Sequence, residues 1–433
     1  MHSLPAHRST LILSTLALLS SSVFAGPGGF LSPRPRPASQ PASPSEFGLT
    51  GDWGGLRSSL RDAGVDVSAF YTGEWMNVVK GGKSRGSVFD GLAKLSLNAR
   101  LDSLVGWQGA TFRISALAPH GTSGSARHAG DLALFSNIDA YDSLRLVDFW
   151  IEQRLLDNQV SLKLGQMRVD DEFGVNNSAL WFINNSFGTP NTPATSMPYA
   201  NYPVGGLGIR LRVEPTENLY GQIGLYDGNP SSGDFADPTT GRFGNAQRHG
   251  TDWALRHSEG FLWASEVGFQ RSGSYPGAVR LGWLHHTDGF NRAALGLGSD
   301  GKTDGSSNSG YLIIEQTLWE KPDAPKEGLN GFLCGIKAQE SRNPMSYSQQ
   351  AGLTYTGLAT HEDKVGIAYA YNKISPLKTN PGGNYESVLE LSYLYPIHSA
   401  VKVQPDLQII RRPGGNTGNR DAWVLGVRAI VEF

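Results

Sequence analysis

The sequence contains one cysteine, Cys334, no long apolar run in its mature part, and almost no net charge. A single cysteine excludes an internal disulfide framework. A transmembrane helix needs at least about 18 consecutive apolar residues, and a formal net charge of −2 offers no basic surface for nucleic acid. A transmembrane β-barrel is not excluded, because only every second residue of its strands faces lipid.

The N-terminal region has the composition of an export signal. His7 and Arg8 precede an apolar core, and small residues lead up to Ala25, which predicts a secretory signal peptide over 1–25. Residues 26–46 are rich in proline, glycine and serine and are expected to form an extended, flexible leader. Within 47–64, Asp52 can cap a short helix that ends before Gly64, and this is the only helix we expect in the mature chain.

The last thirteen residues, 421–433, alternate between two kinds of side chain. One file is apolar and runs from Trp423 through Leu425 and Val427 to Phe433, while the other carries Arg428 and Glu432. This period of two predicts a β-strand with one apolar face. A final strand of this kind is typical of a transmembrane β-barrel, whose last strand pairs with its first. From this strand alone, a half-buried strand of a soluble β-protein remains an alternative.

The same alternation recurs along 65–433 and predicts an all-β fold, a transmembrane antiparallel barrel of about sixteen strands. The expected strands lie near 65–76, 89–101, 110–118, 145–155, 160–168, 206–214, 219–227, 261–270, 278–287, 310–319, 331–340, 347–357, 364–373, 385–395, 400–410 and 421–433. Of these, 310–319 has no clear inward face. The long connections 119–143, 169–205, 228–260 and 288–309 all follow odd-numbered strands. Short turns at one end and long loops at the other are typical of outer-membrane barrels.

The file opposite the apolar one should line the lumen. Its positive and negative charges nearly balance, which favours a neutral, polyhydroxylated solute over an ion. The alternation assigns Lys337 to this polar file and Cys334 to the apolar one. Equally, the charges could merely neutralise one another and stiffen the wall.

The loop between Arg168 and Tyr202 contains apolar and acidic residues that would be unusual in open water. We therefore expect it to fold into the lumen as a constriction. The predicted path and constriction residues are Arg100, Arg113, Glu152, Arg154, Lys163, Arg168, Asp171, Glu172, Trp181, Phe182, Arg210, Arg212 and Glu266.

Several short motifs resemble the carbohydrate-selective porin (OprB) family of Gram-negative outer membranes. They are 49–57 (LTGDWGGLR), 164–167 (LGQM), 171–174 (DEFG), 184–188 (NNSFG), 225–229 (LYDGN), 403–410 (VQPDLQII), 413–415 (PGG) and 425–428 (LGVR), with the terminal Phe433. The resemblance implies a sixteen-stranded barrel for passive diffusion of glucose-like sugars. It also implies that Phe433 is a signal for the barrel-assembly machinery. Arg411 and Arg412 depart from the family, which often has Asn before Pro-Gly.

The remaining expectations follow from this assignment. The protein should lie among outer-membrane lipid, need no cofactor or metal, bind no nucleic acid, and occur as a monomer or homotrimer. A general, non-selective porin is one alternative. An outer-membrane barrel enzyme is another, but His285, His286 and Asp288 form no convincing triad or metal site, since adjacent strand residues point to opposite faces.

Overall fold

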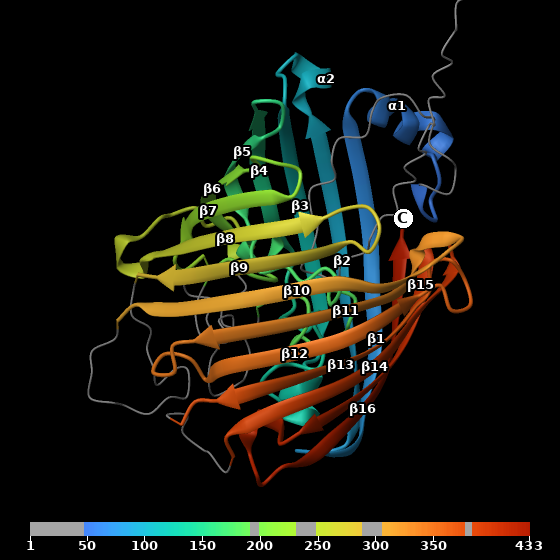
Figure 1. Cartoon of the computed structure of the whole chain (residues 1–433), viewed down its shortest axis with the longest axis vertical. Coiled ribbons are helices and arrows are strands. Elements are labelled where there is room, and N and C mark those ends of the chain that lie inside the picture. Colours follow the sequence, from blue (N-terminus) through green and yellow to red (C-terminus); the bar gives the residue numbers. More distant parts are fainter. Residues whose placement is uncertain (1–46, 191–198, 231–247, 288–304, 377–382) are drawn as a thin grey trace, which may run out of the picture.

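The computed structural model describes residues 47–190, 199–230, 248–287, 305–376 and 383–433, which form a closed antiparallel barrel (Figure 1). The predicted signal peptide and leader lie outside these residues. The strands are β1 (Val65–Gly82), β2 (Gly86–Arg100), β3 (Ala110–Gly121), β4 (Arg145–Leu155), β5 (Val160–Met167), β6 (Gly206–Val213), β7 (Leu219–Asp227), β8 (Phe261–Arg271), β9 (Gly277–His286), β10 (Ser307–Lys321), β11 (Ala324–Ala338), β12 (Met345–Thr356), β13 (Lys364–Ile374), β14 (Tyr385–His398), β15 (Val401–Arg411) and β16 (Arg420–Glu432).

The barrel closes where β16 pairs with β1. The register runs from Phe70 opposite Glu432 to Gly82 opposite Arg420, with irregularities near Lys80. Closure supplies partners for backbone groups that lipid could not satisfy. The predicted count of sixteen strands and the predicted closure of the sheet are therefore confirmed.

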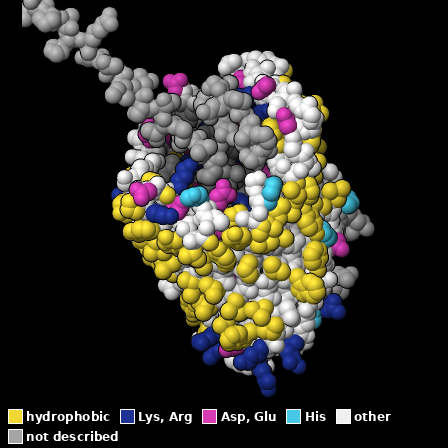
Figure 2. Space-filling model, turned by 90° about the vertical axis from the view of Figure 1, so that its right-hand side faces the viewer, with side chains coloured by type: hydrophobic (Ala, Val, Ile, Leu, Met, Phe, Trp, Pro, Cys, Tyr) yellow, Lys and Arg dark blue, Asp and Glu magenta, His cyan; other side chains and the backbone are white. Residues whose placement is uncertain are grey.

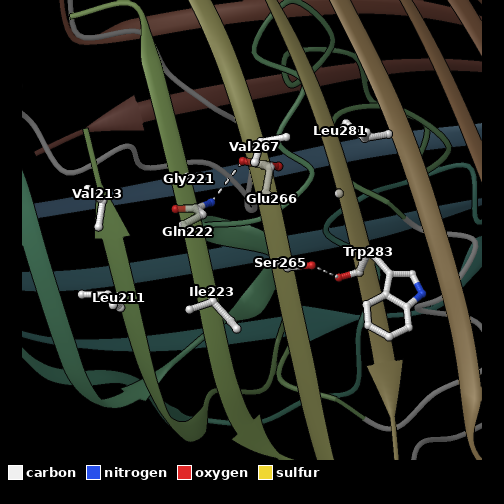
Figure 3. Close-up of a pocket in the computed structure, with 11 residues that line it drawn as sticks. Leu211, Val213, Gly221, Gln222, Ile223, Ser265, Glu266, Val267, Leu281 and Trp283 are labelled. Atoms are coloured by element: carbon white, nitrogen blue, oxygen red, sulfur yellow. Dashed lines mark hydrogen bonds between the residues drawn. The ribbon is translucent and has the colours of Figure 1, made fainter. Parts of the chain in front are cut away.

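The alternation of side chains separates two environments, as β6 to β9 illustrate (Figure 3). On β8, Val267 is 55% exposed on the outer face, whereas its neighbour Glu266 is 3% exposed and faces the lumen. Outward apolar residues form the continuous belt seen in Figure 2. A shallow apolar groove over β6–β9 lies on this outer face, where Gly221 and Ser265 interrupt the large side chains, and it is therefore separate from the lumen.

For β11 we predicted the wrong set of side chains to face the lumen. Cys334 is buried opposite Ile313 of β10, while Lys337 is exposed on the outer face. The physical reason is that the lumen beside β11 is filled by apolar side chains of an infolded loop, with Phe332 lying 6.1 Å from Phe182 between ring centroids. Apolar residues therefore face inward here. On β10, whose facing the sequence left open, Tyr311, Ile313 and Glu315 point inward.

Helical segments are short. The predicted helix is present as α1 (Leu56–Asp62), preceded by a 3-10 turn, η2 (Trp53–Gly55). The expectation of a single helix was wrong, because α2 (Leu101–Val105) follows β2 and a π-helical turn, η3 (Ser125–Ala129), lies between β3 and β4. None of the helices in the described ranges is long and apolar enough to cross a membrane.

Arg57 of α1 joins the N-terminal segment to the closing strands. Its guanidinium is buried and donates to the backbone oxygens of Phe47, of Val67 at 3.0 Å and of Phe433 at 3.2 Å. One side chain thus binds the backbone on both sides of α1 and at the end of the chain. Figure 1 shows α1 beside the end of β16.

Replacing Arg57 with alanine should remove these contacts and leave backbone oxygens without their donor. We expect a loss of about 1–3 kcal/mol in unfolding free energy, measured by urea denaturation of the barrel in lipid vesicles. Arg61→Ala is the matched control, because Arg61 pairs with Asp66 at 3.3 Å in a half-exposed position and should lose less than about 1 kcal/mol. Equal losses for the two variants would contradict this role for Arg57.

Candidate functional site

The described parts of the loop between β5 and β6, residues 168–190 and 199–205, lie inside the barrel. Trp181 donates its indole N–H to Thr354 of β12 at 3.1 Å, and its backbone oxygen accepts a bond from Gln404 of β15 at 2.9 Å. Phe182 and Phe187 pack against Phe332 of β11. These strands belong to the wall opposite the loop's origin, so the predicted infolding is confirmed for the described residues 168–190 and 199–205.

A second loop, residues 122–144 between β3 and β4, also folds inward. Gln408 of β15 donates to the Phe135 backbone oxygen at 2.9 Å, so this loop reaches the same wall. The two infolded loops bind each other as well, because Asn137 N–H donates to Ile183 O at 2.8 Å and Asn185 N–H to Leu134 O at 3.0 Å. We did not predict this second infolded loop.

Four inward-facing glutamates hold the backbone of the infolded loops, and we call them the loop-anchoring glutamates. Glu266 of β8 accepts from the Gly174 amide at 2.8 Å, and Glu315 of β10 from the Ser178 amide at 2.6 Å. On β14, Glu390 accepts from two consecutive amides, those of Ile183 and Asn184, at 2.7 and 2.9 Å.

The fourth, Glu386, uses the same geometry on the other loop. It accepts from the amides of Leu132 and Ala133 at 2.8 and 2.9 Å and from Gly414 at 2.6 Å. Two of the four anchoring residues therefore lie on β14, one for each infolded loop.

Burial inside the barrel raises the pKa values of two carboxyl groups on the loop 122–144. Burial, and after it the nearby Glu386 carboxyl, raise the pKa of Asp131 to about 8. Burial also raises the pKa of Asp139 to about 6, although Ser123 donates to that carboxyl. At neutral pH the loop therefore carries less negative charge than its composition indicates, which favours its position beside Glu386.

Most of the charged residues that we predicted form one network on the wall of β3 to β6. Arg113 pairs with Asp148 at 3.2 Å. Arg210 lies 3.1 Å from Glu152 and 3.2 Å from Glu172 of the infolded loop. Two further pairs complete the network, Lys163 with Glu172 and Arg168 with Asp171, the latter at 3.0 Å.

The other predicted site residues occupy different positions. Glu266 accepts from the hydroxyls of Tyr220 and Tyr311, both at 2.7 Å. Arg212 lies over the Tyr220 ring and pairs with Glu214, while Arg154 is 3.8 Å from Glu152. Arg100 is not part of this network: it donates to the Arg61 backbone oxygen beside α1 at 3.4 Å.

The histidine pair has a structural role. His286 is buried with its Nε2 2.7 Å from the Gly228 oxygen, and His285 lies 2.9 Å from Asn308 and stacks on Trp283. Asp288 lies outside the described residues. Among those that are described, no cluster of three or more metal-ligating side chains occurs.

Removing Glu390 should loosen the infolded loop. In Glu390→Ala the Ile183 and Asn184 amides lose their acceptor, and we expect loop docking to weaken by about 1–3 kcal/mol. Single-channel conductance should rise and become noisier, and proteolysis within 168–190 should be faster. The control is Glu340→Ala, an exposed glutamate paired with Lys373. Unchanged conductance and proteolysis in a folded Glu390→Ala barrel would contradict the anchoring role.

A closed sixteen-stranded barrel with an apolar outer belt and a lumen narrowed by infolded loops is a channel of the porin class. The family described as "Carbohydrate-selective porin, OprB family" matches residues 89–433, and the chain belongs to this family. Family and fold together place it in the outer membrane.

Individual relatives agree with this assignment. The chain is 25% identical to Porin B of Pseudomonas aeruginosa over 92% of this chain and 93% of that protein. It is also 25% identical to the putative porin QuiX of Acinetobacter baylyi, over 89% and 93%. The solved high-pH structure of Pseudomonas putida OprB has the same fold, with a TM-score of 0.79 and 22% identity over 90% of this chain and 99% of that one.

Proposed function

We propose that the protein carries neutral, glucose-sized sugars by passive diffusion across the outer membrane into the periplasm. The observation that supports this most is the pairing of charge in the lumen. In addition to the network on β3–β6, Arg280 pairs with Glu315, and Arg428 with Glu74 at 2.8 Å. An anion channel would need a ring of uncompensated cations and a cation channel a ring of carboxylates.

Side chains in an ion pair can still form hydrogen bonds with a sugar. A guanidinium has five N–H donors and a carboxylate about four acceptor positions, so an ion pair retains groups that can bind hydroxyls. Aromatic side chains add apolar surface for the faces of sugar rings. Such surface lies next to the network, where Lys163 is 4.2 Å from the Trp150 ring centroid. The site residues listed above are our proposed path and constriction.

The two infolded loops narrow the lumen, which brings a small solute close to the paired charges of the wall and favours this proposal over a wide, non-selective porin. The barrel-enzyme alternative has little support, because His286, a candidate base, is buried against a backbone oxygen. Contact with outer-membrane lipid, insertion by the assembly machinery through Phe433, and a monomeric or trimeric state are further parts of the proposal.

Arg210 provides the sharpest test, because two carboxylates depend on it. Arg210→Gln should leave Glu152 and Glu172 undercompensated, which makes the lumen more negative. We expect weaker glucose block in planar bilayers and a reversal potential shifted toward cation selectivity, since fixed charge in the pore sets ion preference.

Arg271→Gln, at the end of β8 and exposed, is the matched control and should change neither quantity. Wild-type conductance that is high and indifferent to glucose would support the non-selective porin instead. If Arg210→Gln alters neither block nor selectivity, Arg210 does not line the path.

A further inference from the structure

Basic side chains gather at the end of the barrel that carries the long loops, which is the outward-facing end in outer-membrane barrels. They lie around the β1–β2 hairpin, η3 and the loop between β15 and β16. We call this set the basic patch. It consists of Lys80, Lys83, Arg85, Arg127, Arg411, Arg412 and Arg420, all exposed or half-exposed. Figure 2 shows Lys and Arg gathered at the lower end of the molecule, beneath the apolar belt.

The three segments of the basic patch pack into one surface. The Lys83 amide donates to His128 O at 2.7 Å, and the Ser84 hydroxyl to Arg127 O at 3.3 Å. Gly82 lies opposite Arg420 in the β1–β16 register. The cations are therefore neighbours in space, although they come from distant parts of the sequence.

The basic patch has little opposing charge. In the parts of the chain that the structure describes, none of its seven cations forms an ion pair with a carboxylate. The exposed carboxylate on these segments is Asp421, which accepts from the Arg412 amide at 3.2 Å. Cations before β8 behave differently, because Arg248 and Arg256 both pair with Asp252.

Aromatic residues place the basic patch at the membrane surface. Lys80 lies 5.3 Å from the Trp423 ring centroid and Arg412 lies 4.4 Å from that of Tyr385. Tyr385 in turn stacks on Tyr371 with centroids 5.2 Å apart. Aromatic girdles of membrane barrels lie at the level of the lipid headgroups. The cations beside them are therefore at the depth where lipid phosphates occur.

We propose that the basic patch binds the phosphate groups of a phosphorylated glycolipid in the outer leaflet. Guanidinium and ammonium groups recognise phosphate by charge-assisted hydrogen bonds, and each cation near an anionic membrane surface strengthens binding several-fold. The aromatic and apolar surface directly beneath would contact the acyl chains. This site is on the outside of the barrel and is independent of the sugar path.

Bisphosphorylated lipid A, its dephosphorylated form and inorganic phosphate are suitable probes, measured by native mass spectrometry and thermophoresis on the whole folded barrel. The test variant replaces Arg85, Arg127, Arg411 and Arg420 with glutamine. Among the described residues, none of these four side chains donates a hydrogen bond, so folding should be preserved. The charge-matched control replaces Arg248, Arg256, Arg271 and Lys326 with glutamine.

We expect lipid A to bind wild type and the control variant, and to bind the test variant at least about tenfold more weakly. Exchanging the same four arginines for lysine should retain most of the affinity. Equal binding of phosphorylated and dephosphorylated lipid, or equal losses in the test and control variants, would overturn the proposal. Competition by inorganic phosphate at the lipid's own concentration would show an ion site and would overturn it too. Unchanged conductance and glucose block in the test variant would show that the channel itself is intact.

Discussion

The hydrogen-bonded seam between β1 and β16 is the constraint on which the rest of the structure depends. In lipid there is no water to bind an unpaired strand edge, so an open sheet of this length would expose a costly row of backbone groups. Closure also fixes the inward direction of every second residue around the ring. The paired charges of β3–β6, the contacts of Phe182 and Phe187 with Phe332, and the loop-anchoring glutamates converge only because the sheet is closed.

Inside this frame, the lumen is built largely from the protein's own loops. A loop placed inside a barrel carries amides that cannot reach bulk water, and these need acceptors. Glutamates on β8, β10 and β14 provide them, and the two infolded loops provide further bonds to each other. Arg210 and Lys163 both pair with Glu172 of the loop from the other wall. The charges of the proposed sugar path and those that hold the infolded loop thus belong to one network.

The sequence was sufficient to predict the strands, because alternation is a direct consequence of having lipid on one side and water on the other. It also predicted that the stretch around Trp181 turns inward, since two adjacent large aromatics are unfavourable in an exposed loop. The loop 122–144 could have been recognised by the same logic from Leu132, Leu134, Phe135 and Ile138. For β11 the pattern was misleading: Phe332, Cys334 and Ile336 face inward because an infolded loop, not water, covers them. Alternation gives two faces but does not say which is inside when the inside is itself apolar.

Glu386 and Glu390 are four residues apart on one strand, and each anchors a different infolded loop. Side chains of a strand change face with every residue, so a slip of β14 by one position against β13 and β15 would turn both carboxylates toward lipid. Both loops would be released at once, and two carboxyl groups would enter the hydrocarbon region, where a polar group without a hydrogen-bond partner is costly. The width of the lumen therefore depends on the register of a single strand, β14. An inserted or deleted residue in the first half of β14 would be far more damaging than the same change in a surface loop.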